Sequence, residues 1–134
     1  MTLIDLPAAI RTHLLAEAAV VALTGTRIYA EEDTPPAGYK PGTDGTALCF
    51  RVRGGGPDFP DARLMPSVLF RCYAANKPDA QELYRALYAA LHGHCGATVR
   101  YGQIDMLGET LTDPDTGFPF VLCAFRLAVV AESS

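Results

Sequence analysis

The residues from 118 to 130 form a strongly apolar run in which both alternating sets of positions are hydrophobic except at Arg126. One set is Val121, Cys123, Phe125, Leu127 and Val129, and the other is Phe118, Phe120, Leu122, Ala124, Arg126 and Ala128. Side chains of a strand alternate between its two faces, so this run predicts a strand that is buried on both. Such a strand lies either centrally in a sheet under helices or against another subunit.

Four further runs have the composition of strands, at residues 27–29, 47–53, 64–74 and 99–107. In the second of them one face is apolar, and the other becomes cationic at Arg51 and Arg53. A glycine-rich segment should end that run, so we expect residues 54–63 to form a flexible hairpin tip.

Two helices are predicted from apolar residues at helical spacing. Asp5 can cap the first helix, and Gly25 should stop it at about Leu23 or Thr24. Its stripe is Ile10, Leu14, Ala18 and Val21. The second helix should run from about residue 76 to 92, with a stripe of Ala80, Leu83, Leu87 and Ala90 or Leu91.

These elements predict one α+β domain over residues 1–134. Its sheet is expected to be mostly antiparallel or mixed, with about four to five strands and two helices in α-β-β-β-α-β-β order. With 134 residues, of which 49% are hydrophobic, the chain is long enough to bury about two thirds of its unfolded surface.

Residues 30–46 are rich in proline, glycine and acidic side chains, a composition that predicts no regular structure. Long loops in small domains are usually functional or mobile. We therefore expect a contact loop that becomes ordered only in the presence of a partner.

The charges are unevenly distributed around a net charge of -4. Residues 1–50 carry 3 basic and 6 acidic side chains, residues 51–100 carry 7 and 4, and residues 101–134 carry 1 and 5. A basic middle between acidic ends favours head-to-tail contact between copies, although the same charges could simply solvate separate faces. The acidic balance argues against a dedicated nucleic-acid binder.

The N-terminus lacks the pattern of a secretory signal, and no run approaches the length of a membrane-spanning helix. A soluble, intracellularly made protein with no membrane partner is expected. The four cysteines, Cys49, Cys72, Cys95 and Cys123, are expected to be thiols, mostly in the core, because they are widely spaced and no secretory signal accompanies them.

The sequence carries few signals of catalysis or metal binding. His92, His94 and Cys95 resemble metal ligands, but no second ligand pair accompanies them. Asp113-Pro114-Asp115-Thr116-Gly117 resembles the start of a calcium loop, yet the twelfth position is Ala124 instead of a glutamate, so a turn is predicted. No nucleophile elbow, phosphate loop or dinucleotide fingerprint occurs, and we expect no enzyme, cofactor or metal site.

The order of these segments resembles the tail terminator and tail completion proteins of tailed bacteriophages, which also occur in prophages and gene transfer agents. The resemblance rests on a first helix that ends in Leu23-Thr24-Gly25-Thr26-Arg27-Ile28-Tyr29, a proline-rich loop, a strand over 48–52, the strand Val68-Leu69-Phe70-Arg71-Cys72-Tyr73-Ala74 and a helix rich in Leu, Ala and Tyr. It covers roughly residues 5–130, and the 30–46 loop and the 54–63 tip depart from it.

The resemblance implies an α+β fold and a homo-oligomeric ring, commonly a hexamer. Such a ring stacks on the last ring of tail-tube protein, stops tube growth and offers a surface to connector or neck proteins of the head. DNA would pass through it without sequence-specific binding, in a virion assembled in the host cytoplasm.

Three alternatives stay open at this point. The chain could be a head completion or connector protein of the neck, a small metal-dependent or hydrolytic enzyme using His92, His94 and Cys95, or a monomeric adaptor. The candidate interface residues are Tyr29, Glu31, Glu32, Asp33, Tyr39, Lys40, Arg51, Arg53, Arg63, Tyr84, Asp113 and Asp115.

Overall fold

The computed structural model of the chain describes residues 2–58 and 63–133. Its elements are, in chain order, β1 (Thr2–Leu3), α1 (Leu6–Leu15), α2 (Ala18–Thr24), β2 (Ile28–Ala30), α3 (Pro41–Asp44), β3 (Ala47–Asp58), β4 (Arg63–Tyr73), α4 (Lys77–Leu91), β5 (Gly93–His94), β6 (Val99–Thr112), β7 (Pro119–Val130) and β8 (Glu132–Ser133).

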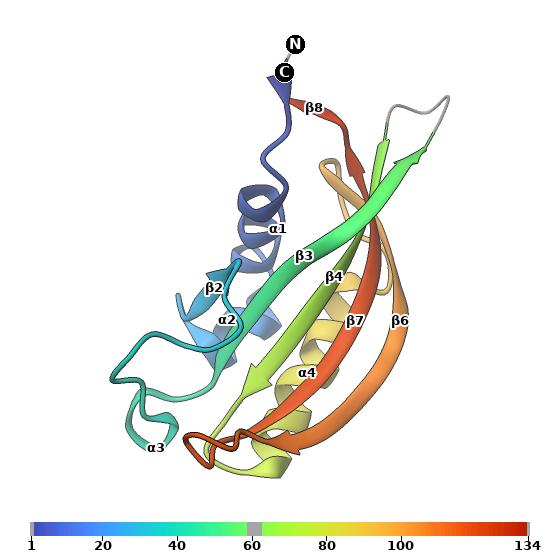
Figure 1. Ribbon diagram of the computed structural model, residues 1–134. Helices are drawn as coiled ribbons and strands as arrows, with labels where there is room; N and C mark the ends of the chain where they lie inside the picture. The colour runs from blue at the N-terminus through green and yellow to red at the C-terminus, as the bar shows by residue number, and fades with distance from the viewer. Residues whose placement is uncertain (1, 59–62, 134) are drawn as a thin grey trace.

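The fold is α+β, as predicted, with a mixed sheet in the order β2-β3-β4-β7-β6-β5. β2 pairs with β3 in parallel, and all other neighbours in this sheet are antiparallel. The long helix α4 packs against one face of the sheet, and α1 and α2 join the same apolar core (Figure 1). The expected count of four to five strands was too low, because β5 has only two residues and leaves no alternation in the sequence.

The last strand, β7, lies between β4 and β6 in the interior of the sheet. The face that it turns toward the helices includes Val121, Phe125 and Val129, which are fully buried. On the opposite face Ala124 is fully buried and Phe120 is 9% exposed. The prediction of a strand buried on both faces is therefore confirmed except at Arg126, which is exposed.

The single N-terminal helix that was expected is two helices, α1 and α2, bent by 91° at their junction. Because of the bend, Val20 and Thr24 are the buried residues of α2, instead of the Ala18 and Val21 of the predicted stripe. α2 then packs against α4, and Gly25 ends it with a φ of 57°. The sequence gives no breaker at this junction, so tertiary packing decides the bend.

No single helix in the described part of the chain is long and apolar enough to cross a membrane. Taken together, α1 and α2 have that length and composition, but they form a bent pair.

Helix α4 agrees with the prediction. Asn76 caps it by accepting a hydrogen bond from the Asp79 amide at 2.9 Å, and the helix ends at Leu91 before Gly93, whose φ is 93°. The buried stripe is Ala80, Leu83, Leu87, Ala90 and Leu91.

The glycine-rich segment expected to end a strand is instead part of β3, so the predicted extent of the tip was wrong. Gly55 pairs with Pro66 and Gly56 with Met65, after a bulge that follows Val52. A side chain at Gly55 would overlap the carbonyl oxygen of Met65, so the close approach of β4 requires glycine there. The rest of the expected tip, residues 59–62, lies outside the described residues.

Candidate assembly surface

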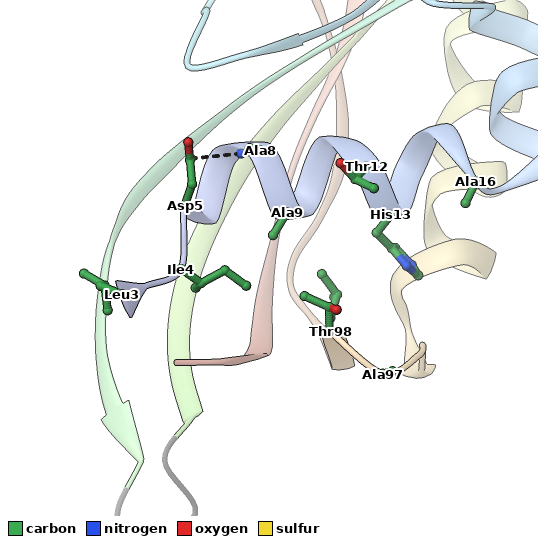
Figure 2. Close-up of a pocket in the computed structure, with 11 residues that line it drawn as sticks. Leu3, Ile4, Asp5, Ala8, Ala9, Thr12, His13, Ala16, Ala97 and Thr98 are labelled. Atoms are coloured by element: carbon green, nitrogen blue, oxygen red, sulfur yellow. Dashed lines mark hydrogen bonds between the residues drawn. The ribbon is translucent and has the colours of Figure 1, made fainter. Parts of the chain in front are cut away.

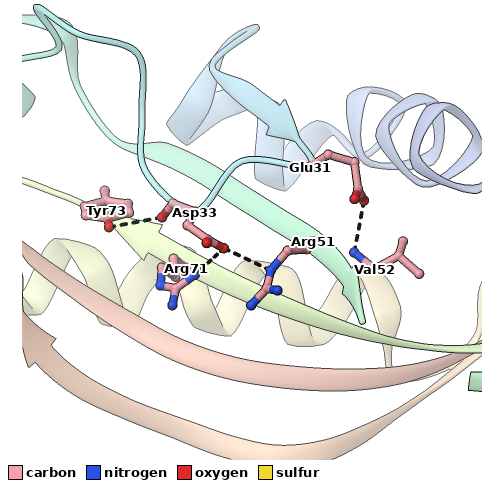
Figure 3. A network of polar contacts seen from close by, with 6 residues as sticks. All are labelled: Glu31, Asp33, Arg51, Val52, Arg71 and Tyr73. Carbon is pink, nitrogen blue, oxygen red and sulfur yellow. Dashed lines mark hydrogen bonds and ion pairs between the residues drawn. The ribbon is translucent and has the colours of Figure 1, made fainter. Parts of the chain in front are cut away.

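We call the sheet face that points away from α1, α2 and α4 the open face, and the segment Glu31–Asp33 the acidic strap. The strap follows β2 at the edge of the sheet and runs onto the open face (Figure 3). It belongs to the 30–46 loop that the sequence singled out as a contact loop.

Asp33 joins the strap to two neighbouring strands (Figure 3). Its Oδ1 accepts hydrogen bonds from Arg71 Nη1 of β4 at 2.8 Å and from Arg51 Nε of β3 at 3.1 Å. The Tyr73 hydroxyl donates to the Asp33 carbonyl oxygen at 3.2 Å. One carboxylate therefore satisfies two guanidinium groups, which are the strongest class of donor for it.

Glu31 closes the edge of β3 where β2 ends. Its Oε1 accepts a hydrogen bond from the Val52 amide at 3.0 Å, and the Glu32 amide donates to the Phe50 carbonyl at 3.3 Å. Glu31 has a φ of 61°, and it is the single non-glycine residue with positive φ in the described part of the chain. This backbone conformation is unfavourable for a side chain with Cβ, so the contacts must stabilise it.

The loop is thus held in place within one chain, which differs from the expectation that only a partner would order it. Further along, the Tyr39 hydroxyl donates to the Gly45 carbonyl at 2.6 Å, and the Lys40 amide donates to Asp44 Oδ2 at 2.9 Å. The short helix α3 lies in this segment, so the prediction that residues 30–46 have no regular structure was wrong there. Burial raises the pKa of the Tyr39 phenol, which therefore stays protonated as a donor.

Arg53 continues the cationic face of β3 that the sequence predicted. Its Nε donates to Ser67 Oγ at 3.0 Å, and its Nη2 lies 3.7 Å from Asp105 Oδ2 on β6. Because β4 and β7 lie between β3 and β6, this ion pair crosses two strands of the open face. Arg51 and Arg53 therefore both contact acidic groups of their own chain, whereas one of the two interpretations of the charge pattern placed their partners on a neighbouring copy.

Several side chains of the open face are apolar and closely packed, around the exposed Arg126 of β7. Leu69 of β4 is 8% exposed and Ala128 of β7 is 3% exposed, although no helix of the described chain covers this side. The Tyr73 ring stacks on Phe120 with centroids 5.0 Å apart, and the Arg71 guanidinium lies 6.0 Å from the Phe120 centroid. The face thus mixes apolar and aromatic side chains with charged groups, as protein interfaces do.

The 30–46 loop, which was predicted to be a contact loop, lies next to the 113–117 turn, which contains the candidate residues Asp113 and Asp115. They line a hollow of about 220 Å³, and Tyr39 packs edge-on against Phe118 with centroids 6.0 Å apart. Asp113 is only 8% exposed, and its Oδ1 accepts from the Asp115 amide at 2.9 Å, as expected of the turn. Asp115 itself is exposed.

Tyr29, Tyr84 and Arg63 lie in different places. Tyr29 packs with the buried cluster around Cys49 and Tyr73 on the open face. The Tyr84 hydroxyl accepts from the Gly108 amide at 3.0 Å, so Tyr84 joins α4 to β6. Arg63 begins β4, beside the residues that are not described.

The three possible metal ligands near the end of α4 have other contacts. The His92 ring stacks on Tyr88 at 4.6 Å and its Nδ1 accepts from the Ile104 amide at 3.3 Å. Cys95 Sγ lies 3.5 Å from the Leu91 carbonyl, and His94 packs against a tyrosine ring. No three metal-ligating side chains gather anywhere in residues 2–58 and 63–133.

The four cysteines are free, and Cys49, Cys72 and Cys123 are buried, as predicted for core thiols. Burial raises the pKa of Cys49 to about 12 and that of Cys72 well above its ordinary value. Burial also raises the pKa of Cys95, which is only partly exposed. These thiols therefore lack the lowered pKa of a reactive nucleophile.

A cleft of about 600 Å³ lies between α1 and the segment before β6 (Figure 2). Small side chains dominate its wall, among them Ala8, Ala9 and Ala97. Its two titratable groups have structural contacts: Asp5 caps α1 through the Ala8 amide at 3.2 Å, and His13 Nε2 lies 3.3 Å from the Ala90 carbonyl oxygen of α4. Convergent polar groups, which mark a catalytic pocket, are absent from this described wall.

Comparison with known proteins gives a match at the level of fold. No protein-family model matches the chain, and no curated protein matches it. Among solved structures, the chain is similar to one from the virion of a native gene transfer agent particle, with a TM-score of 0.65 and 22% sequence identity. The likeness covers 92% of this chain and 93% of that chain. The two share their fold over almost their whole length.

Arg71, Tyr73 and Asp105 are parts of the surface that the sequence did not mark. The sequence predicts Arg71 and Tyr73 only as strand residues. In the paired strands, however, they lie on the same face of the sheet as Arg51 of β3. Asp105 had no such signal, because it meets Arg53 only through the order of the strands.

Proposed function

We propose that this chain is a structural protein of a phage-like virion that forms a ring, most simply of six copies, at the end of the tail tube. The observation that carries the proposal is the likeness to a chain of the gene transfer agent virion, which extends over nearly all of both chains. A shared fold alone does not fix a role, so the surface must supply the rest of the support.

The open face and the strap support an assembly role. A sheet face that carries both apolar and charged side chains is suited to contact with other proteins. The ring would act by surface complementarity and symmetry, with no covalent chemistry. It would cap the tail-tube protein on one side and meet connector or neck proteins on the other, in the virion.

The acidic balance of the chain fits passage of DNA through such a ring. A net charge of -4 repels phosphate, so DNA would slide through without sequence-specific binding. Candidate contact residues are those of the strap, the hollow between the 30–46 loop and the 113–117 turn, and Arg51, Arg53 and Arg63.

Deletion of the gene from a producing strain tests the proposal. Electron microscopy of the particles should then show tail tubes without a defined length and heads that lack tails. Tails of normal length that fail to join heads would favour a connector in the neck instead. Unchanged infectious or transferring particles would contradict both roles.

A further inference from the structure

We propose that the acidic strap is an edge guard, which closes the free edge of β3 against strand addition by a second copy of this chain. The proposal begins with the unequal length of two neighbouring strands. β2 pairs only with Leu48, Cys49 and Phe50 of the twelve-residue strand β3. Within the part of the chain that the structure describes, β3 has a neighbour strand on one side only from Arg51 onward.

An unpaired edge of this length is a template for another strand. On the opposite side of the sheet the edge strand β5 pairs only with Tyr101 and Gly102 of β6, and α4 contacts the rest of β6. The Gly108 amide donates to the Tyr84 hydroxyl, the Ile104 amide to His92 Nδ1, and Gln81 Nε2 lies 2.8 Å from Thr110 Oγ1. β3 is therefore the long strand whose edge needs another form of protection.

The strap supplies it at the first unpaired position. Glu31 turns out of the strand direction through its positive φ, and its carboxylate takes the place of a strand carbonyl at the Val52 amide. Asp33 then fastens the strap to Arg51 and Arg71 on the open face. The backbone at Glu31 adopts an unfavourable conformation that the carboxylate contact stabilises.

Glu32 provides a matched control for substitutions of Glu31 and Asp33 in the acidic strap. Glu32 carries the same charge as Glu31 and Asp33, lies between them in the sequence and is exposed. Within the described residues its carboxylate makes no hydrogen bond or ion pair, and only its backbone amide is bonded, to the Phe50 carbonyl. For a double control, Glu82 of α4 and Glu132 of β8 are exposed acidic residues that lie outside the candidate contact residues.

Hydrogen exchange at the Val52 amide tests the first half of the proposal. Glu31→Ala should raise its exchange rate by about tenfold, the cost of one hydrogen bond, whereas Glu32→Ala and Glu31→Gln should leave it near the wild-type rate. Glu31→Gln retains an oxygen acceptor, so it separates the hydrogen bond from the charge. Equal rates in Glu31→Ala and Glu32→Ala would overturn the proposal, whether the wild-type chain is a ring or a monomer.

Self-association tests the second half. The double variant Glu31→Ala/Asp33→Ala should form species larger than the wild-type ones, while Glu82→Ala/Glu132→Ala, with the same net charge, should not. Protection of the Val52 amide should return in the larger species as protein concentration rises, because the added strand replaces the strap. An unchanged size distribution, or larger species in which Val52 stays unprotected, would contradict strand addition at β3.

Discussion

Asp33 and Arg71 are 38 residues apart in sequence, and their side chains meet at 2.8 Å on the open face of the sheet. Arg71 is the less exposed partner, with 23% of its side chain accessible, whereas the side chain of Arg51, which contacts the same carboxylate oxygen, is 46% accessible. The Asp33–Arg71 contact also holds the guanidinium beside the Phe120 ring. The geometry makes Arg71 the main anchor of the strap.

Double-mutant cycles should show this difference. Alanine substitutions at Asp33 and Arg71 should give a coupling of about 1 kcal/mol in the free energy of unfolding, and the Asp33–Arg51 cycle less than about 0.5 kcal/mol, because exposed ion pairs are weak. Urea unfolding of the single and double variants supplies the values. Equal couplings in the two cycles would mean that Arg71 is no special anchor.

Gly102 marks a contact between the end of α4 and β6 that excludes any side chain. A Cβ at this position would overlap the Leu91 carbonyl oxygen and meet a methyl group of Leu127 at 3.0 Å. Gly102→Ala should therefore lower the free energy of unfolding by about 3 kcal/mol or prevent folding. Gly96→Ala is the matched control, since the nearest atom there is 3.7 Å away, and it should change stability by less than about 0.5 kcal/mol. Similar losses at the two positions would refute the predicted close approach.

The Tyr84 hydroxyl accepts a hydrogen bond from the Gly108 amide, whereas the Tyr88 hydroxyl makes no hydrogen bond within the described residues. Tyr84→Phe leaves the Gly108 amide without its acceptor and should lower the free energy of unfolding by about 1 kcal/mol. Tyr88 is 37% exposed, and Tyr88→Phe should have almost no effect. Thermal or urea unfolding of both variants, with exchange at the Gly108 amide, decides the matter. A silent Tyr84→Phe would indicate that water replaces the contact.

Alkaline pH should destabilise the fold through its buried thiols. The unfolded chain loses the Cys49 proton near pH 9, whereas the folded chain keeps it to about pH 12. The contribution of this thiol is therefore complete below pH 9 and is lost as the pH rises toward 12, at roughly 1.4 kcal/mol per pH unit. Cys49→Ala should reduce the fall in stability between pH 9 and 10.5 by about 2 kcal/mol relative to wild type. Parallel pH profiles for the two proteins would show that Cys49 titrates normally.

The sequence predicted those elements whose pattern is local. β7 alternates apolar residues on both faces over its whole length, and α4 has a capping asparagine, a regular stripe and a terminal glycine, so both were found close to their true bounds. The bend between α1 and α2 and the pairing of Gly55 with Pro66 depend on distant parts of the chain. Composition alone cannot reveal them.

The same distinction applies to the candidate surface. The sequence marked Asp33, Arg51 and Arg53 as charged contact residues, but their partners within the chain follow from strand order. Arg71 reaches Asp33 only because β4 lies beside β3, and Asp105 reaches Arg53 across two further strands. The charge pattern allowed these residues to have partners on a neighbouring copy, but Asp33, Arg51 and Arg53 all have charged partners within their own chain.

The oligomeric state of the purified chain tests the proposed ring most directly. Native mass spectrometry, over a range of protein concentrations and at moderate ionic strength, should show one discrete oligomer, six copies in the simplest ring. A monomer at every concentration, confirmed by light scattering, would contradict the ring and with it the proposed role at the end of the tail tube.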